Sequence, residues 1–380
     1  MATPAFDFLI IGAGIAGVSL ADALAPFGRI ALIEAERHPG YHSSGRSAAL
    51  FASNYGSDAF RALARASRAF LSAPPAGFAA QPLVSARGAL NIARADQRTR
   101  LEQAADEIRA RGGLIESLSP TAARAKVPLL RGRYLAAASY EAGVLDIDVH
   151  GLLQGFLRRA RTRGAQLLFG ARLDAAQRSH GCWEVRLQDQ SLRARVLLNA
   201  AGAWSDQVAA RCGVRPLGLQ PLRRTAALIE ARGGGAISTW PAVFDIDEQF
   251  YLKPDAGRLL ISAAEEELTP PCDAHAEDLN VAIAVDRIQR ALDLEVQRVT
   301  HRWAGLRTFA PDRNPVVGFD PAAEDFFWCC GQGGYGIQTC AALSQLAGAL
   351  ARRCPVPDAL TAEGVTAAAV APGRLRAGGI

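Results

Sequence analysis

The opening of the chain carries the feature that most constrains its fold. An apolar run at residues 6–11 leads directly into Gly12-Ala13-Gly14-Ile15-Ala16-Gly17, which has the spacing G-x-G-x-x-G. A helical apolar pattern follows, and a second apolar run at residues 29–33 ends at Glu34. Strand, glycines, helix, strand and acid in this order predict a βαβ unit that binds a dinucleotide.

Each part of this unit has a physical role. Gly12 permits the tight turn after the strand, Gly14 lets the backbone approach a pyrophosphate, and Gly17 lets the helix pack closely on the strand. Glu34, at the end of the second strand, can accept hydrogen bonds from both hydroxyls of an adenosine ribose. This acid favours an unphosphorylated ribose, as in FAD or NAD, over NADP.

The composition excludes several other classes of protein. A chain of 380 residues with 49% apolar and 21% charged residues suits a globular protein of two domains. Basic residues are scattered among acids despite the net charge of +5, so we expect no nucleic-acid partner. The seven cysteines and six histidines show no metal-ligand spacing, and we expect no metal.

The same sequence bears on location. No stretch of about 18 apolar residues occurs, so we expect no transmembrane segment. The first apolar run lacks a basic leader, which argues against a secretory signal. Sparse cysteines in an odd number are typical of unpaired thiols in a reducing compartment. We therefore expect a cytoplasmic protein and leave open a peripheral association with the inner membrane.

The segment after Glu34 is rich in turns and small hydroxyl side chains. It reads His38-Pro39-Gly40-Tyr41-His42-Ser43-Ser44-Gly45-Arg46-Ser47-Ala48-Ala49. Backbone N–H groups, serine hydroxyls and Arg46 in such a loop can donate hydrogen bonds to phosphates and ribitol. The alternative is a solvated loop without a ligand.

Together with the glycine motif, this segment resembles the D-amino-acid oxidase superfamily of FAD enzymes. Within that superfamily, the chain is most similar to bacterial D-arginine dehydrogenase and related D-amino-acid dehydrogenases. The shared pattern is E-x-x-x-x-P-G-x-x-x-S-G-R-S-A-A, which begins at Glu34. Further similar segments follow in order over nearly the whole chain, at residues 199–205, 218–221, 250–257, 303–307 and 332–339.

The resemblance implies an α/β fold with two domains. We expect a Rossmann-like FAD-binding domain at residues 1–84, 143–213 and 305–380, and a discontinuous α+β substrate domain with a mixed sheet at residues 85–142 and 214–304. Strand-like runs occupy residues 166–169, 171–177, 182–187 and 192–198, and a helix capped by Asp148 is expected to end at Gly164. Gly233-Gly234-Gly235 is expected to form a loop tip.

The cofactor implied by the resemblance is FAD, bound without a covalent link. Some relatives attach flavin through a cysteine before the C-terminal glycine motif, but residues 308–317 contain none. A helix after Gly336 would direct N–H groups toward the flavin ring. The candidate cofactor-binding residues are Gly12, Gly14, Ile15, Ala16, Gly17, Glu34, Ala35, Ser43, Ser44, Gly45, Arg46, Ser47, Ala48, Ala49, Leu173, Ala201, Gly202, Trp204, Gly305, Arg307, Gly333, Gly334, Tyr335, Gly336, Ile337 and Gln338.

The reaction implied is oxidative deamination of a D-amino acid to a 2-oxo acid and ammonia, by hydride transfer from Cα to flavin N5. A bidentate guanidinium and a phenol suit a substrate carboxylate. Arg224, Arg307 and Tyr251 match the positions that hold it in the family, and Tyr55 matches a tyrosine on a loop that closes over substrate. Gly334 completes the catalytic set, and no histidine or carboxylate is expected to act as a general base.

The side-chain preference follows from a departure from the arginine-preferring members. Those members place a glutamate where this chain has Ala89 and a histidine where it has Leu50. Ala48 is expected to line the same pocket, and Glu248 is another acid that could reach it. Burying an unpaired cation is costly, so we expect neutral, apolar D-amino acids to be preferred.

Two other functions remain open from the sequence. A flavoenzyme of the same fold could oxidise an N-methyl amino acid or a 2-hydroxy acid, since the same arginines would hold either carboxylate. A flavin-binding protein without turnover is the third hypothesis. The sequence does not decide whether oxygen or a quinone accepts the electrons, nor the oligomeric state.

Overall fold

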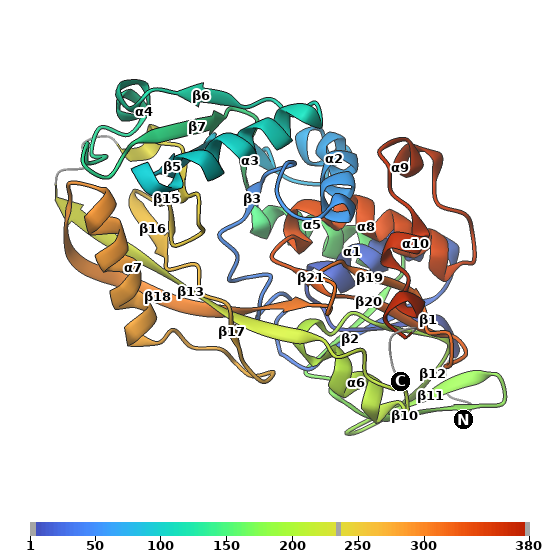
Figure 1. The fold of residues 1–380 in the computed structure, drawn as a ribbon. Coiled ribbons are helices and arrows are strands. Elements are labelled where there is room, and N and C mark those ends of the chain that lie inside the picture. Colours follow the sequence, from blue (N-terminus) through green and yellow to red (C-terminus); the bar gives the residue numbers. More distant parts are fainter. Residues whose placement is uncertain (1–4, 233–236, 377–380) are drawn as a thin grey trace.

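The computed structural model describes residues 5–232 and 237–376. Within these residues the chain forms a mixed α/β fold with two large sheets and one small sheet (Figure 1). The predicted fold class is therefore confirmed. The loop tip expected at Gly233-Gly234-Gly235 lies outside the described residues.

The first sheet is parallel with an antiparallel extension. Strands β9, β2, β1, β12 and β20 run parallel in that spatial order, and β19 pairs antiparallel with β20. A hairpin of β10 and β11 lies on the first half of β12. The strands are β1 (Ala5–Ile11), β2 (Ile30–Glu34), β9 (Gln166–Phe169), β10 (Leu173–Ser179), β11 (Cys182–Leu187), β12 (Ser191–Asn199), β19 (Val316–Phe319) and β20 (Phe326–Cys330).

The central strands of this sheet bring two loops together. β1 and β12 end side by side, with Ile11 opposite Asn199. The glycine loop after β1 therefore meets the turn after β12 at the carboxyl edge of the sheet, where open α/β sheets bind ligands. As the apolar run predicts, β1 is buried on both faces, because Leu9 and Ile10 are both 0% exposed.

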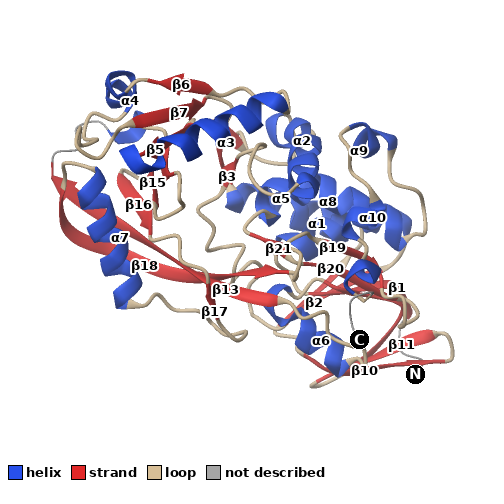
Figure 2. Ribbon diagram, in the orientation of Figure 1, coloured by secondary structure: helices blue, strands red, loops and turns tan. Residues whose placement is uncertain are grey.

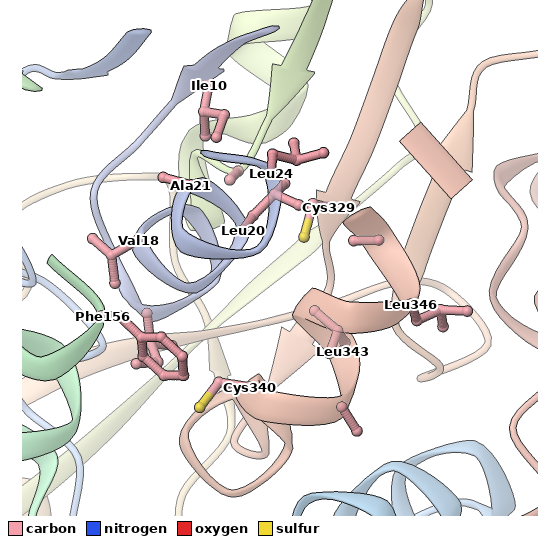
Figure 3. Close-up of a cluster of buried hydrophobic side chains, with 14 of the residues drawn as sticks. Ile10, Val18, Leu20, Ala21, Leu24, Phe156, Cys329, Cys340, Leu343 and Leu346 are labelled. Atoms are coloured by element: carbon pink, nitrogen blue, oxygen red, sulfur yellow. The ribbon is translucent and has the colours of Figure 1, made fainter. Parts of the chain in front are cut away.

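Four helices cover one face of the first sheet and form a group in Figure 2: α1 (Ile15–Leu24), α2 (Asp58–Ser72), α5 (Val149–Thr162) and α8 (Gly336–Ala351). α1 contacts α5 and α8, and α2 contacts α8. Figure 3 shows part of the apolar core between them, with Leu20 and Leu24 of α1 and Leu343 and Leu346 of α8. The opposite face carries α6 (Ser205–Arg211) and the β10–β11 hairpin.

The ends of α5 agree with the sequence prediction. The Asp148 carboxylate accepts a hydrogen bond from the N–H of Gly151 at 2.9 Å, as an N-cap does. Gly164, just after the helix, has a φ of 89°, which only glycine adopts without strain.

The second sheet is mixed and extends in the order β21, β18, β13, β16, β15, β14, β5, β7, β6, with β17 beside β13. A third, small sheet consists of β3, β8 and β4 in that spatial order. The strands of the second sheet are β5 (Ala89–Ala93), β6 (Glu116–Leu118), β7 (Ala137–Glu141), β13 (Gln220–Arg232), β14 (Ala242–Asp245), β15 (Tyr251–Asp255), β16 (Arg258–Ser262), β17 (Glu267–Leu268), β18 (Glu295–Phe309) and β21 (Gln332–Gly333), and those of the small sheet are β3 (Leu50–Phe51), β4 (Val84–Ala86) and β8 (Leu145–Ile147).

Two long strands connect the two halves of the molecule. β13 and β18 pair antiparallel along their length and extend from beside α7 (Asp278–Ala291) toward the first sheet (Figure 1). The end of β18 pairs with β21, which leads directly into α8. β18 continues without a break through residues 304 and 305, where the predicted domain boundary falls.

The remaining helices are short or lie on the second sheet. α7 packs on β13, β16 and β18, and α4 packs on β6 and β7. They are α3 (Arg98–Ala110), α4 (Pro120–Lys126), α7 (Asp278–Ala291), α9 (Asp358–Ala362) and α10 (Ala367–Val370), with 3-10 turns at Ala25–Phe27, Ala95–Gln97, Gly202–Trp204, Ile237–Thr239 and Pro372–Leu375.

Candidate active site

Two adjoining cavities lie at the carboxyl edge of the first sheet. The larger, of about 410 Å³, follows the ends of β1, β2 and β12. The smaller, of about 130 Å³, lies between the glycine loop, β13, β18 and the start of α8. They share the lining residues Gly14, Ser43, Ser44, Ala200 and Gly202, so they meet at the glycine loop.

Two glycines of the glycine loop, Gly12 and Gly17, have no room for a side chain. A Cβ on Gly12 would lie 2.6 Å from the carbonyl oxygen of Ala200, and Gly12 has a φ of 102°. A Cβ on Gly17 would overlap the carbonyl oxygen of Gly12. The N–H of Ile15, at the start of α1, donates to the hydroxyl of Ser44 at 2.9 Å. The loop therefore presents backbone and a helix N-terminus to the cavities, as a pyrophosphate requires.

Glu34 is fixed at the end of β2. Its Oε2 accepts from the N–H of Ala13 at 2.6 Å, and its Oε1 accepts from the N–H of Glu36 at 2.9 Å. Glu34 and Ala35 both line the larger cavity. Carboxylate oxygens have further lone pairs, so this geometry is compatible with the predicted ribose contact.

The larger cavity contains an aromatic pair, His42 and Trp204, of which only Trp204 was among the predicted cofactor-binding residues. Trp204 was predicted there, and the ring of His42 lies 4.4 Å from its ring. His42 also contacts Glu36, with 3.0 Å between Nε2 and Oε1. His42 lies in the serine-rich loop, where no sequence pattern supports its use as a flavin anchor. Arg211, also missed, donates to the carbonyl oxygen of Leu173 at 2.8 Å.

The smaller cavity brings together the residues predicted to hold a carboxylate: Arg224, Tyr251 and Arg307, together with Gly334. In the pairing of β13 with β18, Arg224 lies opposite Gly305 and Leu222 opposite Arg307. The two arginines are therefore diagonal neighbours on one face of the strand pair.

The two guanidinium groups differ in their partners. Arg224 is 8% exposed, and its Nε donates to the carbonyl oxygen of Glu265 at 2.7 Å. Burial lowers the pKa of Arg224 from its ordinary value, and the charge of Arg307 lowers it further. The Arg307 guanidinium makes no hydrogen bond or ion pair within the described residues, and it packs on Gly334, where a Cβ would lie 3.0 Å from its Cζ. The cavity thus has positive charge without a full complement of anions.

Two tyrosines and an acid lie outside this lining. Tyr55 is 44% exposed, and its ring is 5.2 Å from that of Tyr335, which stacks on Phe60 at 4.1 Å. Burial raises the pKa of the Tyr335 hydroxyl above its ordinary value, and the negative charge of Glu248 raises it further. Glu248 itself is exposed on the turn between β14 and β15, with a φ of 54°.

Only one of the four candidate substrate residues lines a cavity. Ala48 lines the smaller cavity, whereas Leu50, Ala89 and Glu248 line neither cavity. Leu50 lies on β3 opposite Asp146, and Ala89 is buried on β5 opposite Glu141. Their contact with a substrate therefore stays a prediction.

The guanidinium of Arg46, which was predicted to bind the cofactor, is bonded to other residues of the protein. It lines the smaller cavity, but its guanidinium donates to the carbonyl oxygens of Ala274 (2.7 Å) and Ala304 (3.0 Å) and pairs with Asp273. It therefore fastens the segment before α7 to the serine-rich loop.

Most other candidate cofactor residues border a cavity. Two of the residues that do not border a cavity contact the neighbouring backbone. A Cβ on Gly45 would lie 2.5 Å from the carbonyl oxygen of Gly40, and the side-chain oxygen of Gln338 accepts a hydrogen bond from the N–H of Ala52 at 2.8 Å. The residues outside both linings are Gly17, Gly45, Ala49, Tyr335 and Gln338. Those lining one or both are Gly12, Gly14, Ile15, Ala16, Glu34, Ala35, Ser43, Ser44, Arg46, Ser47, Ala48, Leu173, Ala201, Gly202, Trp204, Gly305, Arg307, Gly333, Gly334, Gly336 and Ile337.

The described residues contain neither a metal-binding cluster nor a membrane-spanning helix. In residues 5–232 and 237–376, no three or more His, Cys, Asp or Glu side chains are grouped so as to hold a metal ion. None of the helices in these ranges has the length and hydrophobicity needed to cross a membrane.

The chain is similar to known proteins over most of its length. A family model described as FAD dependent oxidoreductase matches residues 7–350. The solved structure of glycine oxidase from Geobacillus kaustophilus has a TM-score of 0.82 and 21% identity, covering 96% of this chain and 99% of that one. At that identity the likeness concerns the fold.

Three curated relatives match over a smaller share of the two chains. FAD-dependent oxidoreductase domain-containing protein 1 of Mus musculus is 25% identical, over 71% of this chain and 62% of that protein. D-amino acid dehydrogenase 3 of Mesorhizobium japonicum is 27% identical, over 66% of this chain and 62% of that protein. Mitochondrial dimethylglycine dehydrogenase of Homo sapiens is 26% identical, over 58% of this chain and 28% of that protein. The matches thus span less than two thirds of each relative.

Proposed function

Because the chain belongs to the family of FAD dependent oxidoreductases, we propose that it deaminates D-amino acids with neutral, apolar side chains, using non-covalently bound FAD. The glycine loop supports the assignment of FAD as the cofactor, because Gly12 and Gly17 leave no room for a Cβ and Glu34 lines the adjoining cavity. Acid precipitation tests the binding mode: the flavin should appear in the supernatant, and flavin retained on the denatured chain would refute non-covalent binding.

The observation that carries the proposal is the positive charge in the smaller cavity. Arg307 has no anionic partner within the described residues, and Arg224 has only Glu266, at 3.4 Å. A substrate carboxylate would give both guanidinium groups an anionic hydrogen-bond partner, since the planar guanidinium binds carboxylates bidentately. Tyr251, 9% exposed and in the same lining, places a phenol where it can donate a further hydrogen bond.

The chain's own residues would orient the substrate and exclude water, while bound FAD supplies the hydride acceptor. No Asp, Glu, His or Lys is among the residues that line the smaller cavity. The substrate amine would therefore be bound in its neutral form, without a general base from the protein. Holding the carboxylate fixes one substituent of Cα, and contacts to the amine and to the side chain are also needed to fix which face of Cα is presented.

The side-chain preference rests on three residues of the lining. Ala48, Ala226 and Ile337 are apolar, and they offer no partner to a cationic side chain. A guanidinium or ammonium buried there would lose its hydration without compensation. The comparison that tests this is kcat/KM for D-leucine, D-methionine and D-phenylalanine against D-arginine and D-lysine. A clear preference for D-arginine would overturn the apolar assignment.

A second candidate is oxidation of an N-methyl amino acid. Dimethylglycine dehydrogenase is among the relatives, and the same arginines suit its carboxylate. The products separate the two: a primary amino acid gives ammonia, whereas an N-methyl amino acid oxidised at the methyl group gives formaldehyde. Turnover of sarcosine or N,N-dimethylglycine with formaldehyde release, and none of D-leucine, would favour the second candidate.

We also propose a cytoplasmic location, supported by seven free cysteines within the described residues, because reducing compartments keep thiols unpaired. Cell fractionation tests it, and recovery of the protein in the periplasm would refute it. The electron acceptor, oxygen or a quinone, is found by comparing oxygen uptake with quinone reduction by the purified enzyme.

A further inference from the structure

The antiparallel pairing beside Arg224 is interrupted by a bulge. Ala227 of β13 pairs with Ile261 of β16, and Arg223 of β13 pairs with Glu267 of β17. Three residues of β13 therefore face five residues, 262–266, on the other chain segment. Bulges of this kind re-aim side chains and occur often beside active sites.

Side chains close the gap that the bulge leaves in the hydrogen-bond ladder. The backbone groups of Thr225 would pair with a neighbouring strand in a regular sheet. Instead, its N–H donates to Oε1 of Glu265, and its carbonyl oxygen accepts from the hydroxyl of Ser262 at 2.6 Å. Ser262 also accepts from the N–H of Ala264 at 3.1 Å, where φ is 55°.

This arrangement frees the main chain of the bulge to hold the arginine. With its carboxylate on Thr225, Glu265 turns its own carbonyl oxygen to the Nε of Arg224, at 2.7 Å. The next residue, Glu266, places Oε1 3.4 Å from Arg224 and 2.9 Å from Arg313. The bulge therefore supplies Arg224 with a neutral acceptor and with a shared counter-charge.

We infer that Glu265 is a positioning residue, whose carboxylate holds the bulge in the shape that orients the Arg224 guanidinium toward a substrate carboxylate. This inference rests on the proposed function, in which Arg224 binds that carboxylate. Arg224 carries a side chain with four torsions, and fixing its Nε restricts the fork to few orientations. A guanidinium held in this way loses less conformational entropy when it binds.

The test uses the FAD-loaded enzyme and benzoate, a carboxylate that cannot be oxidised, with binding followed by the change in flavin absorbance. Arg224→Met checks the underlying proposal and should abolish binding. Glu265→Ala should raise the Kd for benzoate at least about tenfold, because a buried hydrogen bond is lost and the bulge relaxes. Glu265→Gln, whose amide oxygen can still accept from Thr225, should stay within about threefold of wild type.

Two further variants keep the inference falsifiable. Glu265→Asp retains the charge but is one methylene too short, and it should raise the Kd about fivefold even if Glu265→Ala fails to fold. Glu267→Gln is the matched control, because Glu267 pairs with Arg223 rather than Arg224, and it should bind benzoate like wild type. FAD content and Tm are measured for each, since a purely structural role would change these without changing the Kd of the folded enzyme.

The outcomes separate the two claims. If Arg224→Met weakens binding while Glu265→Ala and Glu265→Asp do not, the positioning role is wrong and the proposed function stands. If wild type does not bind benzoate, or if Arg224→Met binds it as wild type does, the proposed carboxylate site is wrong, and the positioning role falls with it.

Discussion

Arg224 and Arg307 lie diagonally across the pair formed by β13 and β18, and both guanidinium groups border the same cavity. Like charges so placed repel each other, and the charge of Arg307 indeed lowers the pKa of Arg224. An anion bound between them would offset this repulsion.

Replacing Arg307 with Met should lower kcat/KM for any amino-acid substrate at least about 100-fold. The loss of a bidentate partner leaves the substrate carboxylate unpaired in the cavity, which costs several kcal/mol. Lys should rescue only partly, because an ammonium lacks the planar fork. Steady-state kinetics with FAD content as the control check this, and an unchanged kcat/KM would show that the carboxylate is bound elsewhere.

Gly334→Ala should act through the same guanidinium. An added Cβ would lie 3.0 Å from the Cζ of Arg307, so the guanidinium must move by a few tenths of an ångström. We expect KM to rise about tenfold, because small displacements of a positioning group are costly. Gly132→Ala is the control, since a Cβ there meets nothing within 4 Å. Equal kinetics for both variants would contradict the close packing of Arg307 on Gly334.

Glu34→Ala should weaken FAD retention. The substitution removes the acceptor predicted for the ribose hydroxyls, and charge-assisted hydrogen bonds are worth about 1.5–3 kcal/mol each. It also frees the N–H of Ala13 in the glycine loop. The ratio of flavin to protein after gel filtration measures the effect, and full occupancy in the variant would show that Glu34 has been misassigned.

The stability of the protein should fall at alkaline pH through buried thiols. Burial raises the pKa of Cys212 from 9.0 to about 12. The folded state therefore favours the protonated thiol, and this contribution is fully present below pH 9 and is lost as the pH rises toward 12. Between pH 9 and 10.5, the unfolding free energy of Cys212→Ala should fall about 1.6 kcal/mol less than that of wild type, because the unfolded thiol is half ionised at pH 9 and the slope then approaches about 1.36 kcal/mol per pH unit.

Urea unfolding at both pH values checks that difference. Cys272, which is exposed, provides the control, because Cys272→Ala should follow the wild-type pH dependence. A wild-type pH dependence in Cys212→Ala would show that this thiol does not govern the alkaline loss.

Local patterns predicted the dinucleotide-binding half of the fold. The strand, glycine and acid order at residues 6–34 was enough for β1, α1 and β2, because each feature acts within one βαβ unit. The strands β9 and β11 have the bounds that the sequence suggested. These elements depend on near-neighbour apolar patterns and caps, which a single sequence shows directly.

The candidate site required information that only long-range pairing provides. Nothing local shows that Arg224 and Arg307 share a face, because this depends on the register of β13 with β18. The bulge at residues 262–266 is likewise a mismatch between strands, so Glu265 and Ser262 gave no signal. Leu50 and Ala89 were placed by motif alignment, which fixes a position along the chain and not the direction of a side chain.

The most direct measurement of the central claim is anaerobic reduction of the enzyme-bound flavin by the two enantiomers of leucine. D-leucine should bleach the oxidised flavin absorbance completely at one equivalent or slightly above, whereas L-leucine, sarcosine and lactate should leave it unchanged. Bleaching by sarcosine or lactate alone would assign the site to a different carboxylate substrate. An absorbance that no amino, N-methyl amino or hydroxy acid changes would contradict the account of a D-amino-acid-oxidising enzyme.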